Sequence, residues 1–300
     1  MIAFLAPGQG SQTPGMLAEW LELPGAADQI ARWSQVSGLD LATLGTTATA
    51  EEITDTAVTQ PLVVATTLLA FGELAKRGLP TTTLVAGHSV GEIAAYAVAG
   101  VISGDDAVKL AAVRGAEMAK ACAVEPTGMS AVLGGDEAEV LARLEALELI
   151  PANRNAAGQI VAAGSVAALE KLAEDPPDKA RVRQLATAGA FHTHYMASAL
   201  DGYAAAAAEI SASDPTMTLL SNCDGRPVTS GSDAMDKLVA QLTRPVRWDL
   251  CTETMRNLTT TAIVEFPPAG ALTGIAKREL RGVATHAVKT PADLDGLTGL

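Results

Sequence analysis

The chain has 300 residues, of which 48% are hydrophobic, with a formal net charge of −13 and three cysteines. The negative charge argues against a surface that binds nucleic acid. The three cysteines form no C-x-x-C pair, which argues against a metal site or a disulfide scaffold and indicates reduced thiols in a cytoplasmic protein. The length exceeds that of a usual single core, so we expect one large domain and a smaller one.

The first third of the chain alternates short apolar runs with helical patterns. A buried strand is predicted at residues 2–6, and a polar, glycine-rich turn follows at 7–12. This start lacks a basic leader, and no apolar run reaches the roughly 18 residues that a membrane span needs, so we expect no signal peptide and no membrane contact. Helices are predicted at 16–20 and 26–38, with a helix start at 49–52 and a long apolar helix that opens at Gln60-Pro61 and ends at 76–78.

The segment Gly87-His88-Ser89-Val90-Gly91 fits the G-x-S-x-G nucleophile elbow, in which a serine sits on a sharp turn between a strand and a helix. An apolar run at 83–86 predicts the strand. The alanine-rich stretch 90–99 predicts the helix, and Glu92 in its first turn suits a helix start. The alternative is a glycine-punctuated loop with a solvent-exposed serine. A further helix is predicted from 104 to about 123.

The pattern changes near Glu125-Pro126 and predicts a small inserted domain. The order of its elements is βαββαβ, which is the ferredoxin-like arrangement. We therefore expect a ferredoxin-like small domain at 126–189, inserted into a large domain formed by 1–125 and 190–300. Its strands are predicted at 129–133, 149–153, 159–163 and 180–185, its helices at 136–146 and 165–174, and a turn at 155–158.

The last third again alternates strands and helices, which is typical of a mostly parallel sheet covered on both faces. The fold class is therefore predicted as α/β. Helices are predicted at 196–210, 235–243, 250–257 and 272–280, and strands at 217–221, 261–266 and 285–288.

A serine hydroxyl needs a neighbouring base to become a nucleophile, and the chain offers four histidines. His88 adjoins Ser89, and adjacent side chains diverge, so it is expected to order the elbow instead. His286 lies in a strand-like segment, which suggests a structural role. His192 and His194 lie in the junction between the two domains, where clefts are common. The residues alone do not rank these two.

With these motifs in order, the chain resembles the malonyl-CoA:acyl carrier protein transacylases of bacterial fatty-acid synthesis, in the actinobacterial style. The resemblance spans nearly the whole length and makes such an acyltransferase the expected function. The motifs that carry it are Gly8-Gln9-Gly10-Ser11-Gln12, Gln60-Pro61, Gly87-His88-Ser89-Val90-Gly91-Glu92, Arg114, Ala190-Phe191-His192 with Met196, Gln241 ahead of Pro245-Val246, and Gly270 with Leu272.

The resemblance implies a hydrolase-like core for the large domain and a Ser–His dyad without a carboxylate. His192, which heads an H-x-x-x-M pattern, becomes the base for Ser89, and the backbone carbonyl of Gln241 orients it. The N–H groups of Gln9 and Val90 are expected to form the oxyanion hole.

The same resemblance implies how substrate is bound. Arg114 would pair with the free carboxylate of malonate, with Met118 and Gln60 in the same pocket, although in isolation it reads as a surface residue of an amphipathic helix. Phe191 would leave little room for an α-methyl group and so favours malonyl over methylmalonyl. No metal or bound cofactor is expected, since the coenzyme A thioester is a substrate. The expected partners are malonyl-CoA and acyl carrier protein, for a monomeric enzyme.

Two other functions share these features. A serine thioesterase or esterase would use the same elbow, and a non-catalytic module that binds carrier protein would keep an unreactive Ser89. Carrier protein is acidic, so a local basic patch would be needed for docking. Lys277, Arg278 and Arg281 could supply it, although cations there also suit a helix C-terminus.

Overall fold

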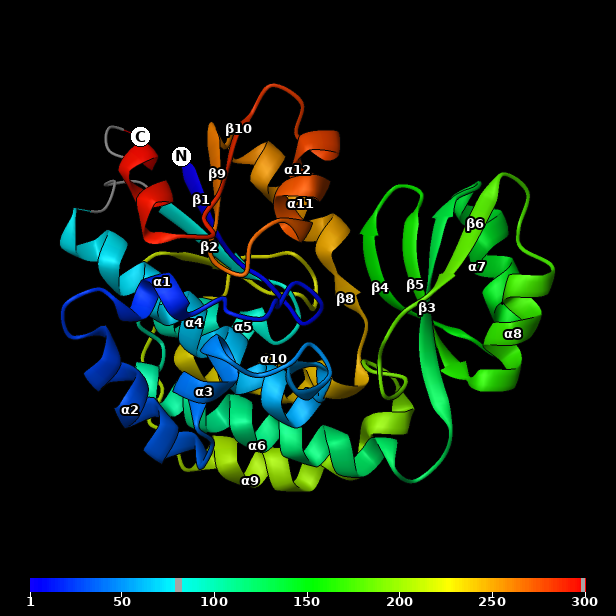
Figure 1. The fold of residues 1–300 in the computed structure, drawn as a ribbon. Coiled ribbons are helices and arrows are strands. Elements are labelled where there is room, and N and C mark those ends of the chain that lie inside the picture. The colour runs from blue at the N-terminus through cyan, green and yellow to red at the C-terminus, as the bar shows by residue number, and fades with distance from the viewer. Residues whose placement is uncertain (79–82, 298–299) are drawn as a thin grey trace.

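The computed structural model describes residues 1–78, 83–297 and 300, and its larger part is built on a parallel sheet (Figure 1). The sheet has five strands in the order β10-β9-β1-β2-β7, and every pairing between them is parallel. The predicted α/β class is therefore confirmed. The strands are β1 (Ile2–Ala6), β2 (Thr83–Gly87), β7 (Thr218–Leu220), β9 (Ala262–Glu265) and β10 (Ala284–Ala287).

Helices cover both faces of this sheet, because alternate residues of each strand point to opposite sides. Phe4 and Ala6 face a large cluster with the central helices, whereas Ala3 and Leu5 face a second cluster on the other side. The helices are α1 (Ala18–Leu21), α2 (Ala26–Ser37), α3 (Leu41–Thr46), α4 (Thr56–Lys76), α5 (Gly91–Val98), α6 (Gly104–Cys122), α9 (Leu200–Ala208), α10 (Gly231–Ala240), α11 (Trp248–Asn257) and α12 (Ala271–Glu279), with 3₁₀ turns at Glu52–Thr54, His194–Ala199, Gln241–Thr243 and Pro291–Leu297.

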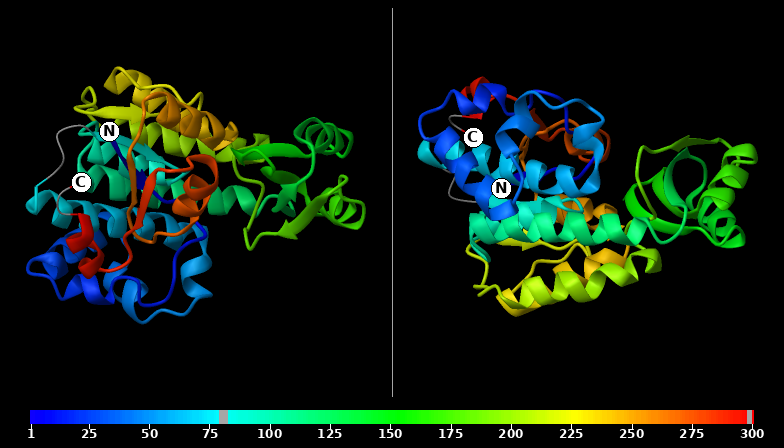
Figure 2. Two further views of the ribbon diagram at one scale, coloured as in Figure 1. Left: turned by 90° about the horizontal axis from the view of Figure 1, so that it is seen from above. Right: turned by 60° about the horizontal axis from the view of Figure 1, so that its bottom comes forward.

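The small domain has the predicted βαββαβ order and projects from one side of the large one (Figure 2). Its sheet order is β6-β3-β5-β4-β8, and the first four strands pair antiparallel. We propose 126 and 189 as its limits. Its elements are β3 (Thr127–Gly134), α7 (Glu137–Ala146), β4 (Ile150–Ala156), β5 (Gln159–Ser165), α8 (Val166–Glu174) and β6 (Ala180–Gln184).

A strand that the sequence did not predict joins the two domains. β8 (Val246–Arg247) belongs to the last third of the chain, yet it pairs in parallel with β4 of the small sheet. Two residues give no readable periodicity, which explains why this strand was missed.

The start of α4 was predicted too late, and its length was underestimated. The helix begins at Thr56, because the side chain of Asp55 accepts a hydrogen bond from the N–H of Ala57 (2.9 Å) and caps it. Pro61 lies inside the helix and marks no start. By length and composition α4 could cross a membrane, contrary to the prediction, but 72% of its apolar window is buried in the protein. It is the core helix of the large domain.

Candidate active site

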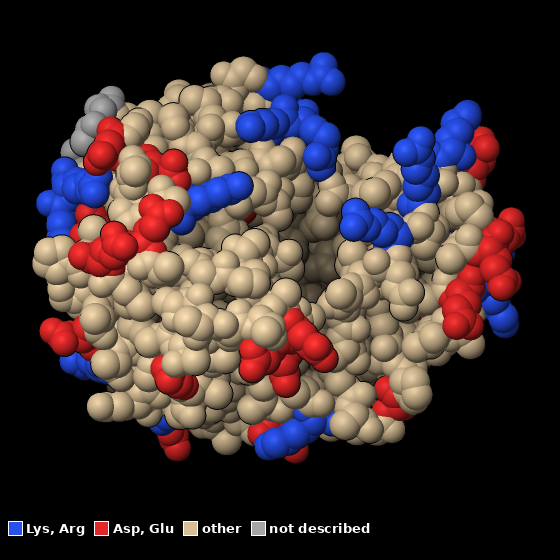
Figure 3. Space-filling view, in the orientation of Figure 1, with Lys and Arg blue, Asp and Glu red and all other residues tan. Residues whose placement is uncertain are grey.

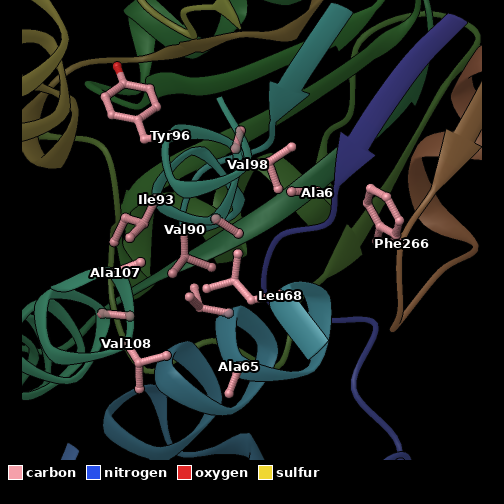
Figure 4. Packing of buried hydrophobic residues seen from close by; sticks show 14 of the residues in the cluster. Ala6, Ala65, Leu68, Val90, Ile93, Tyr96, Val98, Ala107, Val108 and Phe266 are labelled. Carbon is pink, nitrogen blue, oxygen red and sulfur yellow. The ribbon is translucent and has the colours of Figure 1, made fainter. Parts of the chain in front are cut away.

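Ser89 lies on a tight turn between the end of β2 and the start of α5. Its φ of 54° lies in the left-handed region, which is strained for a residue other than glycine and is typical of a functional turn. A Cβ atom on Gly91 would lie 2.3 Å from the carbonyl oxygen of Ala6, so only glycine lets α5 approach β1 this closely. Val90 enters the core near Leu68 (Figure 4), while Ser89 stays half-buried at the carboxyl edge of the sheet.

The structure brings His192 to Ser89. The Oγ atom of Ser89 lies 2.7 Å from Nε2 of His192, and Nδ1 of His192 donates to the backbone carbonyl of Gln241 at 2.9 Å. That second bond places the proton on Nδ1, so Nε2 is free to accept the serine proton. Burial, reinforced by the charge of Arg114, lowers the pKa of His192 to about 3. The imidazole is therefore neutral at physiological pH, as a proton acceptor must be.

The other three histidines are not available to Ser89. His194 is exposed, and its ring packs on Tyr195. Nε2 of His88 lies 2.8 Å from the side-chain oxygen of Asn155, so this histidine connects the elbow to the small domain. His286 lies on β10, at the edge of the large sheet. The fold thus places His192, and not His194, beside Ser89. Spacing in the sequence could not distinguish the two histidines.

The loop after β1 lies against the elbow. A Cβ atom on Gly8 would lie 2.8 Å from the carbonyl oxygen of His88, so the backbone at Gln9 passes close to the nucleophile. Within residues 1–78 and 83–297, the N–H groups of Gln9 and Val90 donate to no protein acceptor. Two free donors beside a nucleophile are what an oxyanion hole requires.

Arg114 is buried rather than exposed on a helix surface, with 1% of the residue accessible. Its Nη1 donates to the side-chain oxygen of Gln60 (2.7 Å), and its Nη2 donates to that of Gln241 (2.9 Å). Both partners are neutral, and Nε has no hydrogen-bond partner among the described residues. A buried guanidinium held by neutral groups is well suited to bind an anion.

The other predicted pocket residues surround this guanidinium to different degrees. The side-chain amide of Gln60 donates to the hydroxyl of Thr56 (3.0 Å) and contacts the sulfur of Met118 (3.3 Å). Thr56 in turn donates to the side-chain oxygen of Gln9 (2.9 Å), which links the oxyanion loop to the Arg114 pocket. Phe191 is buried in the hydrophobic cluster that also contains Met118.

Two residues of the site were missed. The side chain of Asn222 accepts from the N–H of Ser89 (2.8 Å) and donates to the carbonyl of Gly87 (2.7 Å), so it holds both sides of the elbow. It follows β7 at the carboxyl edge of the sheet, and that position is the signal that could have found it. Glu92 was read as a helix-start acid and as the last residue of the elbow motif, with no role in the site. It is fully buried and accepts hydrogen bonds from Asn222 and Gln241.

Comparison with known proteins identifies the family. A family model described as "Acyl transferase domain" matches residues 3–292. The "Malonyl CoA-acyl carrier protein transacylase" of Mycolicibacterium smegmatis is 78% identical over 290 residues, which cover 95% of this chain and 100% of the relative. The chain belongs to the malonyl CoA-acyl carrier protein transacylase family.

Solved structures of transacylases share this fold. The crystal structure of the transacylase MCAT from Mycobacterium tuberculosis matches with a TM-score of 0.97 and 74% identity, and it covers 99% of both chains. A malonyl-transacylase in complex with a type II PKS acyl-carrier protein matches with a TM-score of 0.93 and 30% identity, over 98% of this chain and 97% of that one. Among the described residues of the present transacylase, no group of three His, Cys, Asp or Glu side chains could hold a metal ion.

Proposed function

We propose that the chain transfers a malonyl group from coenzyme A to the phosphopantetheine thiol of acyl carrier protein, through a malonyl ester on Ser89. The observation that carries this proposal is the contact of Ser89 with His192 beside the buried guanidinium of Arg114. Ser89 and His192 supply a nucleophile and a base, and the guanidinium of Arg114 supplies a partner for a carboxylate.

The reaction has two half-reactions of the same chemistry. His192 takes the proton of the Ser89 hydroxyl as its oxygen attacks the thioester carbonyl, and the N–H groups of Gln9 and Val90 stabilise the oxyanion. The carbon–sulfur bond then breaks, and the imidazolium returns its proton to the leaving thiolate of coenzyme A. In the second half, the carrier thiol gives its proton to His192 and attacks the ester, and the serine hydroxyl re-forms.

Substrate choice follows from Arg114. A planar guanidinium can donate two parallel hydrogen bonds to a carboxylate, whereas an acetyl group offers none. Gln60 and Gln241 hold the guanidinium in place from two directions. Malonyl-CoA is therefore preferred to acetyl-CoA.

The test is to follow the acyl group itself. The protein is incubated briefly with malonyl-CoA, and the modified residue is located by peptide mass spectrometry; carrier protein is then added. We expect the malonyl group on Ser89 first and on the carrier thiol afterwards. A thioesterase would instead release free malonate at a rate independent of carrier, and a non-catalytic module would carry no label.

Phe191 is proposed to exclude an α-methyl group, because it is buried and directly precedes His192. Phe191→Ser should raise methylmalonyl use relative to malonyl, since a smaller side chain opens space beside the acyl group. The ratio of kcat/KM for the two thioesters measures this. An unchanged ratio would remove Phe191 from the specificity site.

The carrier is proposed to dock on basic side chains around the hollow between the domains, where Figure 3 shows Lys and Arg on both sides. Lys277 and Arg281 are exposed at and just after the end of α12. Arg181 and Arg183 are exposed on β6 and alternate with Val182, which packs toward α7 and α8, so both lie on the opposite face of the small sheet.

Charge reversal should weaken this docking. The double variant Lys277→Glu/Arg281→Glu should raise the KM for carrier several-fold, more strongly at low salt, because carrier and enzyme then repel. Acylation of Ser89 by malonyl-CoA should change little. Lys171→Glu, on α8, is the control for charge reversal outside this patch, with half the change in net charge. An equal effect of this control on KM would indicate net charge rather than a docking site.

We also propose that the protein acts as a monomer in the cytoplasm. The three cysteines Cys122, Cys223 and Cys251 are free, as expected for a reducing compartment. Size-exclusion chromatography with light scattering tests the monomeric state.

A further inference from the structure

Behind Ser89 lies a buried carboxylate that the transfer steps do not use. Glu92 has no exposed surface, and it accepts hydrogen bonds from the backbone N–H of Asn222 (2.6 Å) and from the side-chain amide of Gln241. In the described part of the chain it forms no ion pair with a Lys or Arg. Burying a carboxylate in this way is costly, whereas an exposed one would serve a helix start equally well.

The contacts of Gln241 indicate what this carboxylate does. The side-chain oxygen of Gln241 accepts from Arg114 (2.9 Å), while its side-chain nitrogen donates to Glu92 and to the carbonyl of Ser89 (3.2 Å). Its backbone carbonyl holds His192. With a carboxylate on one side and a guanidinium on the other, the amide has only one favourable orientation. Glu92 therefore fixes the orientation of Gln241, and Gln241 in turn orients His192 and Arg114.

The charges around Arg114 change when substrate arrives. In the free protein, Glu92 is separated from Arg114 only by the Gln241 amide, so one guanidinium is balanced by one carboxylate. The malonyl group brings a second carboxylate to the same buried guanidinium. Two carboxylates that share one cation in a low-dielectric site cannot both remain ionised at little cost.

We propose that Glu92 is a positioning residue of the transacylation site and that it takes up a proton from solvent when the malonyl carboxylate reaches Arg114. The proton returns to solvent when the malonyl group leaves on the carrier. This inference rests on the proposed function, because it requires a carboxylate in the acyl pocket.

Among the described groups that surround Glu92, only Arg114 is charged at neutral pH. Burial raises the pKa of Glu92 itself to about 7, so gain or loss of its proton is easily driven by a new charge nearby. The other titratable neighbours are Tyr96 on the same helix, Tyr203 on α9, Cys251 on α11 and His192. They stay neutral, because burial raises the pKa of the two phenols and of the thiol and lowers the pKa of the imidazole.

Proton uptake on ligand binding directly tests whether Glu92 is protonated when the malonyl carboxylate reaches Arg114. Ser89→Ala and the double variant Ser89→Ala/Glu92→Gln are titrated with malonyl-CoA or acetyl-CoA by calorimetry, in buffers of different ionisation enthalpy. Above about pH 7.5, malonyl-CoA should cause up to about one more proton to bind than acetyl-CoA does, and only when Glu92 is present. Acetyl-CoA cancels the contribution of the coenzyme A phosphates. Equal proton uptake for the two ligands, or unchanged proton uptake in the double variant, would overturn the proposed protonation of Glu92.

Kinetics test the positioning role. Glu92→Gln keeps one acceptor oxygen and carries no charge, as the protonated carboxyl does, so its kcat should stay within a few-fold of the wild type. The KM for malonyl-CoA, however, should no longer rise with pH through about 7. His192 does not titrate in this range, so the wild-type rise reports Glu92. Glu92→Leu removes both acceptors, and its kcat should fall roughly 10- to 100-fold, as for other residues that orient a catalytic group.

These outcomes separate the inference from the proposed function. Circular dichroism and thermal melting show whether each variant is folded. If Glu92→Leu folds and keeps its kcat, Glu92 does not position the site. If the wild-type protein forms no malonyl-serine, the proposed function fails, whereas normal transfer with none of the Glu92 effects overturns the inference alone.

Discussion

Ser89→Ala is expected to abolish malonyl transfer, with kcat/KM falling by roughly 10⁴- to 10⁶-fold. The hydroxyl that contacts His192 is the only group in the described site that can form the ester while its base is in place. Without it, His192, the oxyanion donors and Arg114 can bind the thioester but cannot split its reaction into two easier steps.

The measurement is the malonyl adduct, detected on the intact protein and then located by peptide mass spectrometry. Ser232→Ala, which changes an exposed serine on α10, should label fully and serves as the control. Ser89→Ala should remain folded, because alanine and serine tolerate the left-handed turn about equally. A stable malonyl adduct on Ser89→Ala would refute the assignment of the nucleophile.

Arg114→Ala is expected to lower kcat/KM for malonyl-CoA by roughly 10²- to 10⁴-fold and to remove the preference over acetyl-CoA. Two charge-assisted hydrogen bonds to a carboxylate are each worth about 1.5–3 kcal/mol, and both are lost. Arg114→Lys should recover little of the loss, because an ammonium cannot reproduce the planar pair of donors.

Steady-state rates with both thioesters provide the measurement. Arg143→Ala, which breaks the ion pair of Arg143 with Asp175 in the small domain, is the matched control and should change neither rate. The decisive quantity is the ratio between donors. An equal loss for malonyl-CoA and acetyl-CoA would mean that Arg114 only supports Gln60 and Gln241 and does not bind the substrate carboxylate.

Much of the fold could be predicted from local patterns. The alternation of strands and helices and the βαββαβ insertion were both readable, because each element is long enough to show its period. Predictions failed where the structure depends on distant contacts or on short elements. β8 has two residues and exists only because β4 lies beside it. The predicted helix at 196–210 is a 3₁₀ turn followed by a shorter helix, α9, that ends at Ala208.

The site divides in the same way. Ser89 was identified from a motif of neighbouring residues, whereas His192 and Gln241 rested on resemblance, since no spacing rule joins them to the elbow. Arg114 was ambiguous, because the sequence does not tell which face of α6 is buried. Asn222 and Glu92 were missed because their roles arise only when β7, α5 and the turn at Gln241 are packed together.

The order of the site along the chain has a consequence for biosynthesis. Ser89, His192 and Gln241 leave the ribosome in that order, and the strand that completes the small sheet follows Gln241 closely. β9, which must insert beside the N-terminal strand, emerges later still. A nascent chain therefore carries an inert hydroxyl through most of its translation, and reactivity toward thioesters begins only when the last strands are released.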